Sequence, residues 1–217
     1  SSMRLKPATC ARVTRTSFGF MPTFTRATCS CRASSCTLSI STTHVTGLPT
    51  GYFELDDLTC GLQNGEMIIV AGRPSMGKTA FALNIARNAA VDHHTPVAIF
   101  SLEMSKEQLS LRMLCSEARI DSSKLRGGFF SMEDWHRLTD AADVLSASPI
   151  YIDDSPSMSA MEIRAKARRL KMDKNLGLII IDYLQLMQAP ESGENRATEI
   201  SAISRSLKAL AKELNVP

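Results

Sequence analysis

Short apolar runs alternate with amphipathic stretches along most of the chain, from about residue 46 onward. Each run is bounded by turn-forming or polar residues, which is typical of strands buried in a sheet. The expected strands cover residues 66–71, 96–101, 150–153 and 177–182. Because the runs are almost continuously apolar and do not alternate strictly, they predict a parallel sheet that is covered on both faces.

The stretches between these runs carry apolar residues at three- and four-residue steps, which predicts helices. Two of them open with a serine and a Gln or Glu three residues later, a pair that satisfies free amides at a helix start. These pairs are Ser105 with Gln108 and Ser159 with Glu162. The expected helices cover residues 79–91, a segment after Ser105, and residues 132–145, 159–172 and 200–214. Alternating strands and helices predict an α/β fold, a mostly parallel sheet flanked by helices.

The first 44 residues differ from the rest of the chain: they are rich in Ser and Thr, carry Arg, contain no acidic residue and show no apolar periodicity. We therefore predict a disordered or non-native segment over residues 1–44 and a folded domain over residues 45–217. Two other interpretations of the segment stay open. One is an organelle transit peptide, because such peptides are rich in Arg and Ser and poor in acids. The other is a zinc site formed by Cys29, Cys31 and Cys36.

Charge and hydropathy narrow the class of protein. The formal net charge is +3, but residues 1–53 hold six basic residues and no acid, so the rest of the chain is slightly acidic. Bulk charge therefore predicts no polyanion partner, and any contact with nucleic acid must come from local patches. The longest apolar stretch, residues 176–187, contains Asp182 and is too short to span a membrane.

The turn after the first expected strand carries the clearest chemical signal. Residues 72–79, GRPSMGKT, match the phosphate-loop pattern G-x-x-x-x-G-K-[ST] between a strand and a helix. Backbone amides in such a loop point at phosphates, and the helix start adds its positive end. Lys78 is expected to reach the β- and γ-phosphates, and the Thr79 hydroxyl to bind Mg²⁺. The candidate nucleotide-binding residues are Gly72, Arg73, Pro74, Ser75, Met76, Gly77, Lys78, Thr79 and Ala80.

Two acidic residues follow other expected strands, at the sheet edge where α/β proteins bind ligands. Asp182 ends the run 177–182 and suits the acid that supports the hydrated magnesium ion. Glu103 follows the run 96–101 and suits a general base that activates the attacking water. The structural alternatives are a solvent-facing strand terminator for Asp182 and a solvated loop glutamate for Glu103.

These motifs together resemble a known family over residues 46–217. The matching strings are TGLPTG (46–51), GRPSMGKTA (72–80), SLEMS (101–105), IDYLQLM (181–187) and the segment 199–213. They are similar to the RecA-like P-loop motor domain of the bacterial replicative DNA helicases, the DnaB family. The resemblance implies an ATP- and Mg²⁺-dependent enzyme in which Glu103 and Lys78 are catalytic and Thr79 and Asp182 hold the metal.

The resemblance also implies a biological setting. Members form hexameric rings that hydrolyse ATP between subunits and pull single-stranded DNA through the pore at a replication fork, with primase and a helicase loader as partners. It implies a bacterial cytoplasmic protein, or an organellar helicase if residues 1–44 are a transit peptide. The loop 188–198, which carries Arg196, is expected to face the pore.

The sequence departs from the family pattern at both ends. Where family members have an N-terminal helical domain and a linker helix, it has the segment without acidic residues. Family members continue past the position of Pro217 into another core strand, a γ-phosphate sensor, DNA-contacting loops and an arginine finger. We therefore expect the N-terminal part of a motor domain that is incomplete at its C-terminus and is weakly active or inactive alone. A nucleotide-binding regulatory or recombinase-like module and a gene product without activity are the alternatives.

Overall fold

A computed structural model of the chain describes residues 24–32, 35–43, 46–128, 131–187 and 196–217. The chain divides into two compact units, Ser1–Thr42 and Thr43–Pro217, which are described separately. Strands β1 (Phe24–Arg32) and β2 (Ser35–Thr43) form a two-stranded sheet. These strands were not predicted from the sequence, although Cys36, Leu38 and Ile40 alternate with Ser and Thr along β2. The disorder, transit-peptide and zinc interpretations of residues 1–44 stay predictions.

A three-stranded parallel sheet organises the second unit. Its strands are β3 (Val97–Ser101), β4 (Ile150–Asp153) and β5 (Leu178–Asp182), in the order β4-β3-β5. In the central register Ile99 lies opposite Ile152 of β4 and Ile180 of β5. Three of the four strands expected from the apolar runs are confirmed, as is the parallel α/β sheet.

The helices that connect and cover the strands are close to those expected. They are α1 (Phe53–Thr59), α2 (Lys78–Arg87) with the π-helical turn η1 (Asn88–Asp92), α3 (Lys106–Ala118), α4 (Ser122–Gly127), α5 (Met132–Ala147), α6 (Ala160–Lys174), the 3₁₀ turn η2 (Leu184–Leu186) and α7 (Arg196–Leu214). The predicted capping box of Ser159 and Glu162 starts α6, and Ser105 caps α3 by accepting a hydrogen bond from Gln108 N. No helix among those described is long and apolar enough to cross a membrane.

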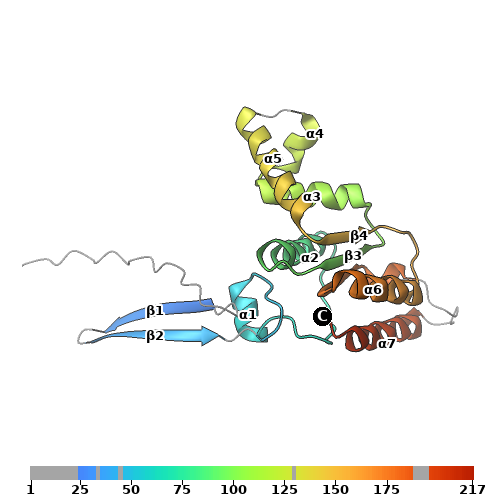
Figure 1. Cartoon of the computed structure of the whole chain (residues 1–217), viewed down its shortest axis with the longest axis horizontal. Coiled ribbons are helices and arrows are strands. Elements are labelled where there is room, and N and C mark those ends of the chain that lie inside the picture. Colours follow the sequence, from blue (N-terminus) through green and yellow to red (C-terminus); the bar gives the residue numbers. More distant parts are fainter. Residues whose placement is uncertain (1–23, 33–34, 44–45, 129–130, 188–195) are drawn as a thin grey trace, which may run out of the picture. The chain divides into compact units, whose positions relative to one another are not determined.

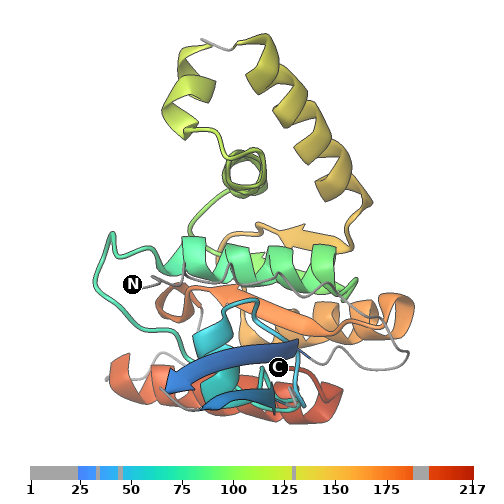
Figure 2. The same ribbon diagram turned by 90° about the vertical axis from the view of Figure 1, so that its left-hand side faces the viewer.

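Strand β3 is buried on both faces and divides the core into two layers. Val97 and Ile99 pack with α2 residues such as Leu83 on one face. Ala98 and Phe100 pack on the other face with residues of α6 and α7. Figures 1 and 2 show α2 on one side of the sheet and α6 and α7 on the other. Helices α3, α4 and α5 extend away from the sheet and share a smaller apolar cluster (Figure 2).

The expected strand at residues 66–71 is wrong. The segment has no regular secondary structure and pairs with no described strand, and Ile68, Ile69 and Val70 are 49%, 65% and 47% exposed. A mainly apolar cavity of about 350 Å³ is lined by this segment and by β5. The sheet thus offers the segment no hydrogen-bonding neighbour, and its apolar side chains face the cavity or solvent instead of a core.

Candidate functional site

The phosphate loop forms a tight turn before α2. Two of its residues, Ser75 and Gly77, have positive φ angles of 64° and 87°, and Met76 N donates to Arg73 O at 3.3 Å. Helix α2 begins directly after Gly77, which leaves the first amides of the helix directed at the loop. Left-handed residues beside a helix start create a concave set of backbone donors, a geometry that suits phosphate oxygens.

The two predicted metal residues meet beside this loop. Thr79 Oγ1 donates a hydrogen bond to Asp182 Oδ2 at 2.8 Å, although the two residues lie 103 positions apart in the sequence. Thr79 comes from the first turn of α2 and Asp182 from the end of β5. A hydroxyl and a carboxylate are hard oxygen ligands of the kind that Mg²⁺ prefers, directly or through its waters. The donor set therefore fits a magnesium ion bound with phosphates.

Glu103 lies at the same edge of the sheet, in the turn that follows β3. Ser101 pairs with Asp182 in the β3–β5 register, and Leu102 N donates to Asp182 O at 2.7 Å. The buried Ser101 hydroxyl closes the turn, because it donates to Met104 O at 2.7 Å and accepts from Met104 N at 3.1 Å. This turn leaves Glu103 exposed to solvent, next to the strand end that carries Asp182.

Lys78 turns back across the loop. A Cβ at Gly72 would lie 3.4 Å from Lys78 Cγ, so the lysine stem lies beside the first glycine of the motif. The Lys78 ammonium lies 5.9 Å from the centroid of the Tyr183 ring. No role for Tyr183 is predicted from the sequence, although its position directly after Asp182 places it at this edge of the sheet.

The other predicted residues are peripheral to these contacts. Arg73, Pro74, Met76 and Ala80 are exposed around the loop. Arg196 begins α7, where it pairs with Glu199 and donates to a backbone carbonyl of η2. Residues 196–198 of the expected pore-facing loop belong to α7 instead. The rest of the loop, residues 188–195, lies outside the described residues, so the expectation that it faces a pore stays a prediction.

The comparison with protein families decides the class of this site. The model of the DnaB-like helicase C-terminal domain matches residues 47–217. The chain belongs to this family. The resemblance found in the sequence is thereby confirmed, and the phosphate loop, Glu103 and Asp182 all lie within the matched region.

Relatives and solved structures agree with the family. The chain is 59% identical over 174 residues to the replicative DNA helicase DnaB of Geobacillus stearothermophilus and 57% identical to the replicative DNA helicase DnaC of Bacillus subtilis. These matches cover 80% of this chain but 38% of each relative, so the chain spans about two fifths of their length.

Two solved structures resemble the chain with a TM-score of 0.76 and 38% identity over 80% of its length. One is a DnaB-like replicative helicase described with its interactions with primase, of which the match covers 42%. The other is an isolated ATPase domain, of which the match covers 62%. Because identity and structural similarity agree, they confirm the RecA-like motor-domain fold of this DnaB-family chain.

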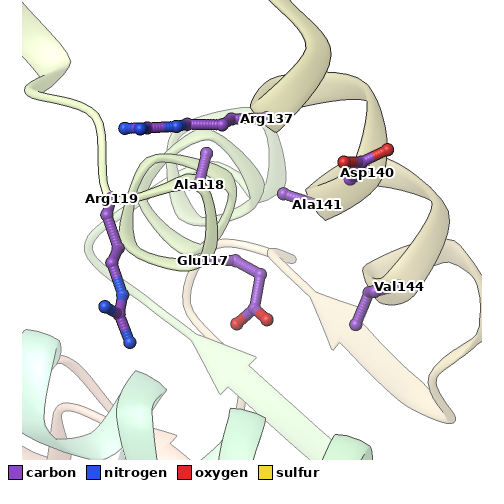
Figure 3. Close-up of a pocket in the computed structure, with 7 residues that line it drawn as sticks. All are labelled: Glu117, Ala118, Arg119, Arg137, Asp140, Ala141 and Val144. Carbon is purple, nitrogen blue, oxygen red and sulfur yellow. The ribbon is translucent and has the colours of Figure 1, made fainter. Parts of the chain in front are cut away.

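A second cavity, of about 420 Å³, lies between the end of α3 and the middle of α5 (Figure 3). Its lining combines two acids and two arginines with small apolar residues: Glu117, Ala118, Arg119, Arg137, Asp140, Ala141 and Val144. Glu117 accepts hydrogen bonds from Arg87 at 2.6 and 2.9 Å, and this contact raises the pKa of the Arg87 guanidinium. Glu117 is thus engaged in joining α3 to α2.

Across the described residues, no group of three His, Cys, Asp or Glu side chains could hold a metal ion.

Proposed function

We propose that this DnaB-family chain forms the N-terminal part of a replicative helicase motor, which couples ATP hydrolysis to translocation on single-stranded DNA and duplex unwinding. The observation that carries the proposal is the hydrogen bond between Thr79 and Asp182 beside the phosphate loop. It joins the two oxygen ligands that a nucleotide-bound magnesium ion requires. The family match over the same residues supports it.

Each site residue has a distinct chemical role in this proposal. The amides of residues 72–79 hold the phosphates, and Lys78 places positive charge at the β- and γ-phosphates. Thr79 and Asp182 hold Mg²⁺, which when bound neutralises charge on the phosphate oxygens. Glu103 accepts a proton from the attacking water as the water oxygen bonds to the γ-phosphorus and the bond from that phosphorus to the leaving ADP oxygen breaks. The exposure of Glu103 supports this role, since the carboxylate must reach a nucleotide bound above the loop.

The setting of this reaction is carried over from the family. We propose a homo-hexamer in the full-length protein, single-stranded DNA in its pore, and primase and a helicase loader as partners. The primase contact of a structural neighbour supports this partner. Bacterial relatives support a cytoplasmic location, and residues 1–44 acting as a transit peptide would change it to an organelle.

The cavity beside β5 supports the expectation that a motor of this kind needs one more core strand. One edge of β5 pairs with β3, while the wall across the cavity is the exposed apolar run 66–71. At this edge Ile179 N donates to the Pro217 carbonyl at 3.1 Å. A strand placed there would bury both walls and pair with β5.

Single-turnover ATP hydrolysis tests the function. The 217-residue chain and a form extended through the complete motor domain are compared with and without single-stranded DNA. We expect DNA-stimulated hydrolysis in the extended form, and Glu103→Gln should lower its rate by at least ~100-fold while ATP still binds. Glu54→Gln, on the exposed surface of α1, is the matched control and should leave the rate unchanged.

Two outcomes would contradict the proposal. Full activity of the short chain as a monomer, indifferent to DNA, would favour a regulatory nucleotide-binding module. An unchanged rate in Glu103→Gln would remove the general base from the mechanism while leaving nucleotide binding intact.

A further inference from the structure

The contact between Lys78 and Tyr183 joins two parts of the site that no motif connects. Lys78 is the first residue of α2, and Tyr183 directly follows β5. The ammonium lies 5.9 Å from the ring centroid, within the range of a cation–π interaction. Both residues line the cavity that also contains Gly72 and Asp182. The ring therefore lies where the phosphate loop and the metal carboxylate come together.

The ring holds the lysine in a way that a carboxylate would not. In the part of the chain that the structure describes, no hydrogen bond or ion pair to the Lys78 ammonium is found, and Asp182 instead accepts from Thr79. An aromatic face attracts a cation through its quadrupole without neutralising the charge. All three ammonium hydrogens stay available to phosphate oxygens. A carboxylate partner would compete with the nucleotide for the same hydrogens.

The lysine stem lies beside the first glycine of the loop. Its Cγ and Cδ lie 3.4 and 3.7 Å from the position that a Cβ on Gly72 would occupy. Gly72 has no Cβ, so the stem lies alongside the loop while the ammonium lies over the ring of Tyr183. A lysine side chain has many rotamers, and a contact that restricts them before the ligand arrives lowers the entropy lost on binding.

We propose that Tyr183 is a positioning residue, whose ring holds Lys78 ready for the nucleotide phosphates in the nucleotide-free chain. This inference rests on the proposed function, because it assigns a role within the same nucleotide site. It predicts that the ring matters and that the hydroxyl does not. Tyr183→Phe should keep the interaction, and Tyr183→Leu should remove it with a side chain of similar apolar character.

Nucleotide affinity is the first measurement. Isothermal titration calorimetry with Mg·ATP compares the 217-residue chain with Tyr183→Phe and Tyr183→Leu. We expect Tyr183→Phe to bind within twofold of wild type and Tyr183→Leu to bind on the order of threefold to tenfold more weakly, as the loss of one cation–π contact implies. Thermal unfolding of each variant shows whether it is folded.

A double-mutant cycle separates positioning from a general structural role. In a Lys78→Met background the ring has no ammonium to hold, so Tyr183→Leu should cause no further loss of affinity. An equal loss in both backgrounds would overturn the proposal, as would wild-type affinity in Tyr183→Leu.

A signature measured without nucleotide keeps this inference distinct from the proposed function. With ¹³C-labelled lysine, the Lys78 ε-methylene protons should show an upfield ring-current shift in wild type and Tyr183→Phe, and not in Tyr183→Leu; Lys78→Arg assigns the signal. If the chain binds no nucleotide but the shift is present, the proposed function fails and the positioning of Lys78 stands. The absence of the shift in wild type overturns the positioning itself.

Discussion

Strand β3 and the apolar run at residues 66–71 have similar sequences and opposite surroundings. Both are short apolar segments that end in a turn carrying site residues. β3 is paired on both edges, by β4 and β5, and its residues are buried on both faces. The run 66–71 has no strand neighbour among the described residues, and Ile69 is 65% exposed. The difference shows that an apolar run becomes a buried strand only where partners distant in the sequence pair with it and cover it.

The two segments also differ in how firmly they hold the site residues that follow them. Glu103 lies just after β3 and Asp182 ends β5, and both strands are held by the sheet and by helices on both faces. The phosphate loop follows the unpaired run, and its placement depends on α2 and on the contacts of Lys78 and Thr79. The acids are therefore fixed by the core, while the loop is fixed by side chains that the nucleotide itself engages. We therefore expect the ends of β3 and β5 to resist local unfolding more than the phosphate loop does.

The largest expected effect comes from making the same substitution in both segments. Ile99→Ala removes a side chain that is 1% exposed in the centre of the sheet, and should lower the free energy of unfolding by about 2–5 kcal/mol. Ile69→Ala removes one that is 65% exposed and should cost less than about 1 kcal/mol. Urea unfolding followed by circular dichroism measures both. Equal losses would mean that the run 66–71 is buried in solution, and the contrast with β3 would be withdrawn.

Much of the site could be predicted because its signals are local. The spacing of residues 72–79 identifies the phosphate loop, and Asp182 and Glu103 were found from their positions after apolar runs. The structure brings Thr79 and Asp182 together as the fold class requires, since strand ends in a parallel sheet share one edge. The chemical roles of these residues stay predictions until hydrolysis is measured.

The features that could not be predicted from the sequence depend on contacts between distant residues, or belong to elements too short to show a pattern. Pairing of the run 66–71 depends on which strand lies beside it, and Tyr183 meets Lys78 only after β5 and α2 are packed. Helices α1 and α4 have seven and six residues, too few to show a periodic apolar face. The capping box that starts α5 uses Asp134 as the partner of Ser131, outside the Glu or Gln pattern that found the other one.

A smaller effect should come from the segment upstream of the unpaired run. Asp56 is buried and accepts hydrogen bonds from Thr50 N at 2.9 Å, Thr50 Oγ1 at 2.8 Å and Gly51 N at 3.2 Å. Asp56→Ala leaves these donors without their acceptor and should cost about 1–3 kcal/mol of unfolding free energy.

Two control variants define how this result is interpreted. Asp56→Asn keeps one side-chain oxygen and should recover part of the loss, whereas Glu54→Ala on the exposed face of α1 should change stability by less than about 0.5 kcal/mol. If Asp56→Ala were as stable as wild type in urea unfolding, this part of the chain would not contribute to the folded unit.

Asp153, at the end of β4, allows a pH test of how an ionised side chain stabilises the paired strands. Burial tends to raise the pKa of Asp153, but hydrogen bonds from Lys166 Nζ at 2.6 Å and from Ser155 outweigh it and lower the pKa. Because the pKa of Asp153 is lower in the folded state than in the unfolded state, where it is about 3.9, the ionised group stabilises the fold at pH values above the unfolded-state pKa. That stability is lost as the pH falls through the folded-state pKa. Asp153→Asn should therefore cost about 1 kcal/mol at neutral pH and almost nothing in strong acid.

Comparing the variant with wild type at each pH isolates this group. Other carboxylates with lowered pKa values, such as Glu162 and Glu213, titrate in both proteins and cancel in the difference. The measurement is the free energy of unfolding in urea from pH 2 to pH 7. A difference that does not depend on pH would show that the ionised form of Asp153 contributes nothing specific.

The smallest expected effect comes from the phosphate loop, which follows the unpaired run 66–71. Ser75 has a φ of 64°, a left-handed conformation that costs a non-glycine residue about 1–2 kcal/mol. Ser75→Gly relieves this strain but also gives the unfolded chain more freedom, so we expect a net gain of about 0.5 kcal/mol. Gly77→Ala should instead lower the free energy of unfolding, because Gly77 has a φ of 87°, which strains a residue with a Cβ. A Cβ there would meet no atom within 4 Å, so a steric clash would not contribute. If Ser75→Gly were destabilised as much as Gly77→Ala in urea unfolding, relief of backbone strain at Ser75 would not govern the stability of the loop.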